Sequence, residues 1–167
     1  MIRRAQRGRY AAEGAADVNV AAAAAAADRG LPMKAATVTE SAESKKAVFR
    51  RALEMYATGN LSSLDEVMAP NYVGHVSTGD RDLEGLRQSI LHFHNLFVYA
   101  ADSFEVKDQF VEGDKVATRM TARATLRETG APVTLIGINL SRIVDGKIAE
   151  EWNTWEQLQP GQAIPTW

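Results

Sequence analysis

The last third of the chain alternates apolar and polar residues between glycine-containing turns, a pattern typical of antiparallel strands with one buried face. The strongest turn signal is the pair Asp145 and Gly146, because both residue types readily adopt the positive φ angles of a tight hairpin turn. Gly113 and Gly130 mark two earlier turns. The strands expected from this alternation are 104–110, 116–126, 133–144 and 147–158.

Before Ala101, apolar residues recur at helical spacing instead. The first helix is expected to end at Gly59, a second and shorter one before Pro70, and a third to begin near Asp82. Helices grouped first and antiparallel strands grouped last predict an α+β fold. Three helices would pack on a strongly curved antiparallel sheet and leave a conical cavity. The apolar stripe of the first helix consists of Val48, Phe49, Ala52, Leu53 and Tyr56.

Residues 1–40 differ in composition from the rest of the chain. They are rich in alanine, and four arginines precede the first acidic residue, Glu13. A disordered tail explains this composition, and an organelle-targeting peptide is the alternative. Met33 would serve equally well as a start. We therefore divide the chain into a tail (1–40), a folded domain (41–160) and a C-terminal tail (161–167).

The composition of the 167-residue chain argues against several classes of function. Lys and Arg (19) nearly balance Asp and Glu (21) for a net charge of −2, which argues against a nucleic-acid partner. The absence of cysteine excludes disulfides and thiolate chemistry. No apolar run approaches the length of about 18 residues that a membrane span needs. His92 and His94 are poorly spaced for a shared metal on a helix. We predict a cytoplasmic protein with no metal, no cofactor and no membrane partner.

Short motifs along residues 45–158 resemble those of the SnoaL-like polyketide cyclases of the nuclear transport factor two superfamily. The resemblance implies a cone-shaped α+β barrel. It does not determine the chemistry, because this fold hosts isomerases, cyclases, dehydratases, epoxide hydrolases and non-catalytic proteins. The matching segments are MYATGN (55–60), APNYVGH (69–75), EGL (84–86), EGDKV (112–116), DGKI (145–148) and EEW (150–152).

The cone predicted here would bind a small hydrophobic ligand, because its expected lining is mostly apolar. Along the last strand, we expect Glu150 and Trp152 on one face, with Trp152 as a pocket wall, and Glu151 on the other. The substrate pocket is predicted to include Phe49, Leu53, Tyr56, His94, Met120 and Trp152.

His75 and Asn139 are the predicted catalytic residues. His75 follows the second helix, where the resemblance places the aspartate base of ketosteroid isomerase, and a histidine there could move a proton beside a carbonyl. Its alternative role is a hydrogen bond to backbone in an irregular loop. Asn139 lies where relatives carry an acid; an amide can donate to an oxyanion but cannot release a proton. Its alternative role is to satisfy neighbouring polar groups.

One further position differs from the cyclases that the chain resembles: Leu126 stands where many of them have a histidine. Two functions are therefore predicted side by side. The first is a cofactor-free cyclase or isomerase that acts on a carbonyl compound by proton transfer. The alternative is a non-catalytic module for ligand binding or dimerisation.

A homodimer is predicted in either case. The sheet face turned away from the helices is expected to expose apolar side chains, which are costly in water. Packing of two copies sheet to sheet would cover them. The residues assigned to this face are Thr118, Ile136, Ile138 and Leu140.

Overall fold

Three helices precede the main strands, as predicted, in a computed structural model that describes residues 40–165. The predictions for the N-terminal tail, including the alternative start at Met33, lie outside these residues, as do positions 166–167. The helices are α2 (Ala42–Thr58), α3 (Leu64–Val67) and α4 (Leu83–Leu96). None of the described helices has both the length and the apolar character needed to cross a membrane.

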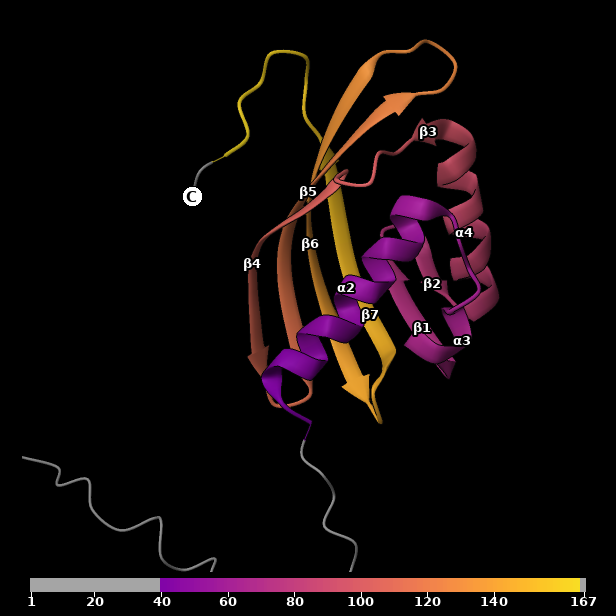
Figure 1. Cartoon of the computed structure of the whole chain (residues 1–167), viewed down its shortest axis with the longest axis vertical. Coiled ribbons are helices and arrows are strands. Elements are labelled where there is room, and N and C mark those ends of the chain that lie inside the picture. The colour runs from indigo at the N-terminus through magenta and orange to yellow at the C-terminus, as the bar shows by residue number, and fades with distance from the viewer. Residues whose placement is uncertain (1–39, 166–167) are drawn as a thin grey trace, which may run out of the picture. The chain divides into compact units, whose positions relative to one another are not determined.

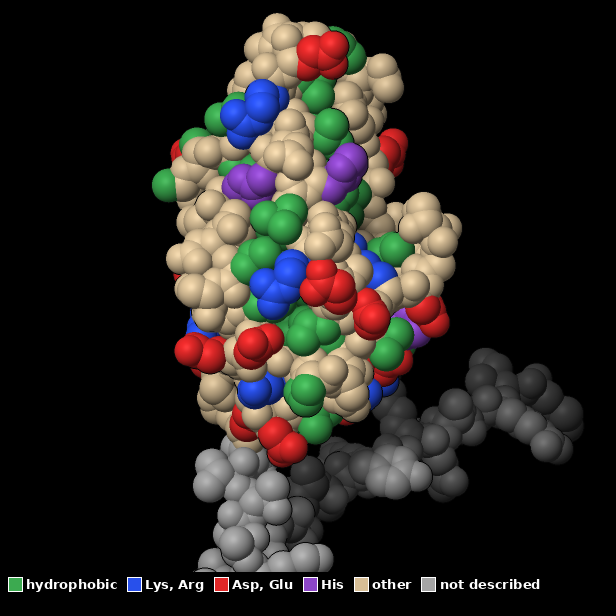
Figure 2. Space-filling view, turned by 90° about the vertical axis from the view of Figure 1, so that its right-hand side faces the viewer, with side chains coloured by type: hydrophobic (Ala, Val, Ile, Leu, Met, Phe, Trp, Pro, Cys, Tyr) green, Lys and Arg blue, Asp and Glu red, His purple; other side chains and the backbone are tan. Residues whose placement is uncertain are grey.

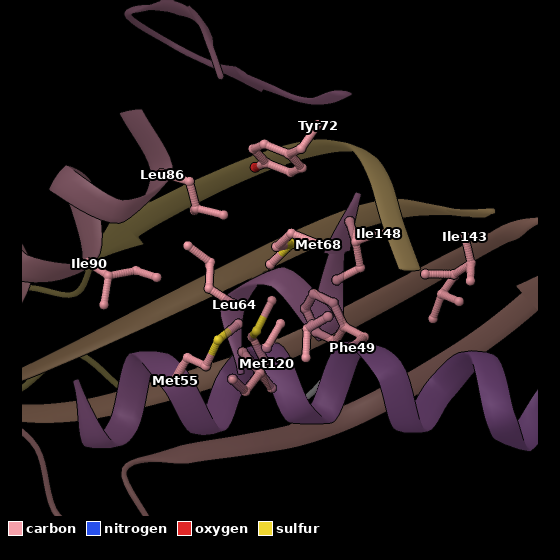
Figure 3. Packing of buried hydrophobic residues seen from close by; sticks show 14 residues of the cluster. Phe49, Met55, Leu64, Met68, Tyr72, Leu86, Ile90, Met120, Ile143 and Ile148 are labelled. Atoms are coloured by element: carbon pink, nitrogen blue, oxygen red, sulfur yellow. The ribbon is translucent and has the colours of Figure 1, made fainter. Parts of the chain in front are cut away.

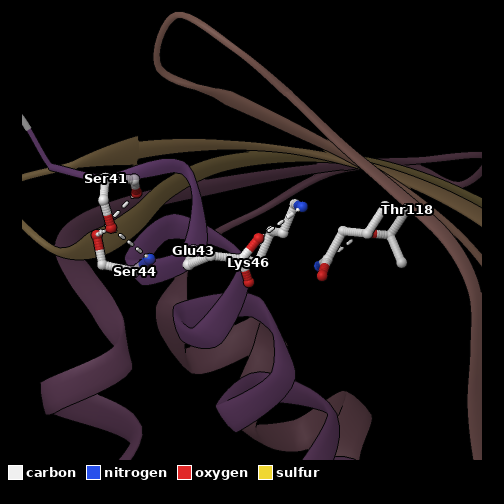
Figure 4. A network of polar contacts seen from close by, with 6 residues as sticks. Ser41, Glu43, Ser44, Lys46 and Thr118 are labelled. Carbon is white, nitrogen blue, oxygen red and sulfur yellow. Dashed lines mark hydrogen bonds and ion pairs between the residues drawn. The ribbon is translucent and has the colours of Figure 1, made fainter.

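Helix α2 begins and ends where local chemistry favours it. The Ser41 hydroxyl accepts a hydrogen bond from the Ser44 backbone N–H (Figure 4), which satisfies one free donor of the first turn. Gly59 ends the helix with φ at 69°, a conformation that costs glycine little. Asp82 caps α4 in the same way as Ser41, through the Gly85 N–H.

The predicted antiparallel strands are confirmed. They are β4 (Phe104–Glu112), β5 (Lys115–Leu126), β6 (Pro132–Val144) and β7 (Lys147–Gln157). Each pairs with the next in antiparallel register. Asp145 and Gly146 both have positive φ, 50° and 74°, as a tight hairpin turn requires.

Three strands were not predicted: β1 (Met68–Val76), β2 (Gly79–Arg81) and β3 (Phe97–Val98). Strand β1 pairs in parallel with β7, so the sheet is mixed, and the prediction of an all-antiparallel sheet is wrong in this respect. The order is β2-β1-β7-β6-β5-β3, with β4 also paired to β5, and the sheet does not close into a barrel. Strand β1 was not predicted because it contains Pro70, which argues against a strand in the sequence. Pro70 lies in a register shift between Met68 and Val73, where its missing N–H is tolerated.

The helices pack on one face of this sheet, which confirms the α+β fold. In Figure 1, α2 crosses the sheet in front of β6 and β7, and α4 lies beside β1 and β2. On the side of α4, Figure 2 shows hydrophobic side chains interspersed with charged ones, as expected for a solvated surface. The buried residues that join helices to sheet include Phe49, Leu64, Met68, Tyr72, Leu86, Ile90, Met120 and Ile148 (Figure 3).

Candidate functional site

A cavity of about 580 Å³ lies between α2, α4 and the inner face of the sheet. This volume is in the range of small-molecule sites. Of the predicted pocket and catalytic residues, five line it: Phe49, Leu53, Tyr56, Met120 and Asn139.

One part of the cavity wall is aromatic. Tyr99 stacks on Phe104 with ring centroids 5.4 Å apart, and Trp155 meets Phe104 edge-on at 6.4 Å. The Trp155 ring also covers Gly137, where a Cβ would come within 2.5 Å of it. A glycine at position 137 therefore gives the tryptophan room against the sheet. Flat, apolar ligands suit such a wall.

The polar part of the wall is centred on Glu151, whose residue is only 4 % exposed. Its Oε2 accepts a hydrogen bond from the Tyr72 hydroxyl at 2.8 Å. Its Oε1 lies 3.2 Å from the Asn139 amide nitrogen and 3.3 Å from the Ser141 hydroxyl. The Ser141 hydroxyl also donates to the Asn139 side-chain oxygen at 2.6 Å. Side chains from two strands, β1 and β6, thus hold the carboxyl group of β7 against the cavity.

Burial raises the pKa of Glu151 above its ordinary value of 4.5, although the Tyr72 hydroxyl and the nearby Arg81 charge act in the opposite direction. Burial also raises the pKa of Tyr56 to about 12. Glu151 is therefore shifted towards neutral pH, where a carboxyl group can both accept and return a proton. Tyr56 therefore remains protonated and can donate its O–H to a ligand.

Arg81, on β2, also lines the cavity. Its Nη1 donates to the Ser89 hydroxyl at 2.9 Å and its Nη2 to the Tyr56 hydroxyl at 3.3 Å. Gly74 leaves room for this arrangement, because a Cβ there would lie 3.0 Å from Arg81 Nε and would clash with the Tyr72 hydroxyl. The side chain thereby links β2 to both helices that cover the cavity.

His75 lies outside the cavity, on the outer face of the sheet, and this corrects the prediction that it lines the pocket. Its Nδ1 is 2.7 Å from Asp80 Oδ1, and its Nε2 is 3.0 Å from Glu150 Oε1. The ring stacks on Trp152 at 4.9 Å. The reason is the parallel pairing of β1 with β7, which places His75 beside Trp152. The prediction that His75 sits in an irregular loop is also wrong, because it belongs to β1.

Trp152 is likewise absent from the cavity lining, and a β-bulge explains why. An uninterrupted ladder counted from the Val144 and Lys147 pair would place Asn139 opposite Trp152. The register shifts after the Ile143 and Ile148 pair, so that Arg142 faces Glu150 and Asn139 faces Asn153. One extra residue, Ala149, moves every later side chain of β7 to the other face. Glu151 thereby enters the cavity, and Trp152 leaves it.

The structure also gives the positions of His94, Leu126 and Thr118. His94 is not among the lining residues, because its Nε2 contacts the Tyr56 carbonyl oxygen at 2.7 Å. Leu126 pairs with Phe97 near the end of the sheet. Thr118 lies opposite Asn139 and is buried on the inner face, not on the outer one. Within residues 40–165, no group of three or more histidine, aspartate or glutamate side chains could hold a metal.

Sequence reasoning missed Glu151, Tyr72, Ser141 and Arg81. The EEW motif contained Glu151, but its face depends on the bulge. Tyr72 and Arg81 belong to β1 and β2, the strands that were not predicted. The one available signal was Ser141, which shares its strand face with Asn139 because the two are separated by two positions.

Several solved protein structures have a fold similar to that of this chain. IdmH from Streptomyces antibioticus is 27% identical, with a TM-score of 0.57 over 67% of this chain and 91% of that one. TsrD from Streptomyces laurentii is 24% identical, with a TM-score of 0.62 over 70% of this chain and 91% of that one. An LEH-like epoxide hydrolase of M. tuberculosis shares the fold at 11% identity, with a TM-score of 0.57 over 68% and 84%.

The search of curated proteins found no match. The model of the SnoaL-like polyketide cyclases matches residues 46–164, which include all the residues that line the cavity. The chain belongs to the SnoaL-like polyketide cyclase family.

Proposed function

We propose that this protein is a cofactor-free cyclase or isomerase in which Glu151 moves a proton on a small hydrophobic carbonyl compound. The observation that carries the proposal is a buried carboxyl group in the wall of a mostly apolar cavity, with its pKa raised by burial. A carboxyl group in this condition is suited to general acid-base catalysis near neutral pH. Glu151 replaces His75 as the proposed base, because His75 faces away from the cavity.

In the proposed reaction, ionised Glu151 takes a proton from the carbon beside the ligand's carbonyl group. The electrons of the broken C–H bond move to the carbonyl oxygen, which becomes an enolate. Tyr56 is positioned to donate to this oxygen, because its hydroxyl lines the cavity and accepts a hydrogen bond from Arg81. Such a donor stabilises charge that develops in the transition state.

The enolate can then react in two ways. Its carbon can attack a second carbonyl group of the same molecule, which closes a ring and forms an alkoxide. Protonated Glu151 then returns the proton to that oxygen. Alternatively, Glu151 returns the proton to a different carbon of a conjugated enolate, which moves a double bond. Asn139 serves as a positioning residue in both routes, because its amide orients the Glu151 carboxyl group.

The test measures proton transfer without knowledge of the natural product. The full chain is incubated in deuterated water with 2-tetralone, and NMR follows loss of the hydrogens beside the carbonyl. The wild-type protein should accelerate this exchange, and Glu151→Gln should lower the acceleration by about 10²- to 10⁴-fold, the usual contribution of a general base.

Glu150→Gln is the matched control, since it makes the same change on the neighbouring residue outside the cavity. It should leave the exchange rate within about twofold of wild type, as surface substitutions generally do. Equal losses in the two variants, or no acceleration by the wild-type protein, would contradict the assignment of Glu151. Circular dichroism of each variant shows whether the fold is retained.

A non-catalytic binding module is the second candidate. It is favoured by one observation, namely that both oxygens of Glu151 already have partners within the protein. In that case Glu151 would only join β1, β6 and β7. Binding of 2-tetralone without any acceleration of exchange, in wild type and Glu151→Gln alike, would support this alternative.

We also propose that the protein forms a homodimer through the outer face of the sheet. Ile138 is 50 % exposed and Trp152 37 % exposed on the described surface, and a second copy would cover both. Ile138→Asp should shift the protein from dimer to monomer in sedimentation velocity. A wild-type protein that sediments as a monomer at all concentrations would contradict the dimer.

A further inference from the structure

The charge of Arg81 lacks a direct counterion. Among residues 40–165, no carboxylate forms a salt bridge with this guanidinium, and its hydrogen bonds go to the Ser89 and Tyr56 hydroxyls. Its Nε is enclosed and has no hydrogen-bond partner. Arg81 is half-buried, and an arginine drawn partly out of solvent is usually paired with an anion, because an uncompensated charge is costly there.

The neighbouring acids are engaged elsewhere, which explains the missing counterion. Asp80 points to the outer face, where its Oδ1 contacts His75. Asp82 caps α4 through the Gly85 N–H. Glu151, the acid within electrostatic range of Arg81, is bound by Tyr72 and Asn139 instead. Arg81 therefore lines the cavity without an ion pair to either of its sequence neighbours, Asp80 and Asp82.

The geometry of Arg81 leaves donors free for a ligand. A guanidinium group has five N–H donors, and two of them are used by Ser89 and Tyr56. Of the remaining three, one is the enclosed Nε–H and two belong to the terminal nitrogens. A carboxylate can accept hydrogen bonds from these two terminal N–H groups. The aromatic wall formed by Tyr99, Phe104 and Trp155 belongs to the same cavity.

We propose that Arg81 is the specificity-determining residue of the cavity and that it binds the carboxylate of an aromatic or polycyclic acid. The proposal rests on the proposed function, because it names the substrate class for the same cavity. The rings of the ligand would pack on the aromatic wall, and its carboxylate would complete the ion pair that Arg81 lacks.

The test compares 2-naphthoate with 2-naphthamide, which have the same shape but differ in charge. Binding to the full-length, isotope-labelled chain is followed by shifts of backbone amide NMR signals. The wild-type protein should bind the acid at least about tenfold more tightly than the amide, as expected for a charged hydrogen-bonded pair. In Arg81→Met the preference should disappear, with binding of the amide retained. Arg81→Lys keeps the charge without the fork and should retain part of the preference.

Arg87→Met is the matched control, because Arg87 lies on α4 outside the cavity lining and pairs with Glu84. This variant should keep the full preference for the acid. Equal affinity of wild type for the two compounds, no detectable binding of either, or an unchanged preference in Arg81→Met would overturn the proposal. A parallel loss of both affinities together with a lower unfolding temperature in Arg81→Met would also overturn it, because a merely structural arginine behaves that way.

Glu151→Gln separates this proposal from the proposed catalysis. The variant should retain the preference for 2-naphthoate while losing hydrogen exchange on 2-tetralone. If exchange persists in Glu151→Gln but Arg81→Met loses its preference, the catalytic assignment fails and charge recognition stands. If Glu151→Gln loses exchange but Arg81→Met keeps its preference for the acid, charge recognition fails and the catalytic assignment stands.

Discussion

Glu150 and Glu151 are neighbours in sequence but lie on opposite faces of the sheet, in opposite electrostatic environments. Glu151 faces the cavity among uncharged donors, and burial raises its pKa. Glu150 lies on the outer face between His75 and Arg142, with Oε2 2.9 Å from Arg142 Nε. Hydrogen bonds from His75 and Arg142 lower the pKa of Glu150.

The difference shows that position, and not residue type, decides which carboxyl group can do acid-base chemistry. A surface carboxylate that accepts hydrogen bonds from an arginine and a histidine has a lowered pKa and gives little driving force for accepting a proton. A buried one with uncharged partners titrates closer to the working pH. The outer cluster of His75, Asp80, Arg142, Glu150 and Trp152 is rich in titratable groups but does not line the cavity of about 580 Å³. The inner face has the cavity, and among residues 40–165 Glu151 is the acid that lines it.

Packing should show the largest contrast between the two faces. Phe49→Ala removes a core ring that is 2 % exposed and should lower the free energy of unfolding by about 3–5 kcal/mol. Phe110→Ala truncates a ring that is 68 % exposed and should change it by less than about 0.5 kcal/mol. Urea denaturation at a concentration where the protein is monomeric measures both. Comparable losses would show that the two faces are equally buried in solution.

The pH dependence of stability should have opposite signs for the two glutamates. Above pH 4.5, folded Glu151 holds a proton that the unfolded chain has released, so its contribution to stability falls as pH rises to its raised pKa. The contribution of Glu150 is present above pH 4.5 and is lost as pH falls through its lowered pKa. Urea denaturation at pH values below and above 4.5 gives the free energy of unfolding of Glu150→Gln, Glu151→Gln and wild type. The difference between each variant and wild type, plotted against pH, should have slopes of opposite sign for the two variants. Parallel difference curves would remove the contrast.

His75→Gln should have the smallest effect. Hydrogen bonds to Glu150 and Asp80 raise the pKa of His75, so its contribution to stability is complete below pH 6.5 and is lost as pH rises through the raised pKa. The variant should therefore be less stable than wild type mainly in acid. Exchange on 2-tetralone should stay within about twofold of wild type. A loss as large as that of Glu151→Gln would restore His75 as the base and place the chemistry on the outer face.

Much of the fold could be predicted because its signals are local. The alternation of β4 to β7, the turn at Asp145 and the stripe of α2 each depend on residues close together in sequence. Five of the predicted site residues also line the cavity, among them Phe49 and Asn139. They were found because a helix face and a strand face can be assigned from spacing alone.

The remaining site residues depended on contacts between distant segments. The sequence of β1 does not indicate a strand, because it contains Pro70. The segment becomes a strand by parallel pairing with β7, more than seventy residues later. Arg81 follows in β2, which pairs with β1. No local pattern could place Tyr72 and Arg81 beside Glu151.

The sequence by itself determined an α+β domain with three helices, a hairpin-rich sheet and a mostly apolar cavity, because helical and strand periods are properties of neighbouring residues. The tertiary structure alone decided which face each late side chain occupies. One extra residue at Ala149 moves Glu151 inward and Trp152 outward, and the parallel strand β1 then brings Tyr72 to that carboxyl group. A shift of one residue reverses a strand's two faces, and its position is settled by pairing across the sheet.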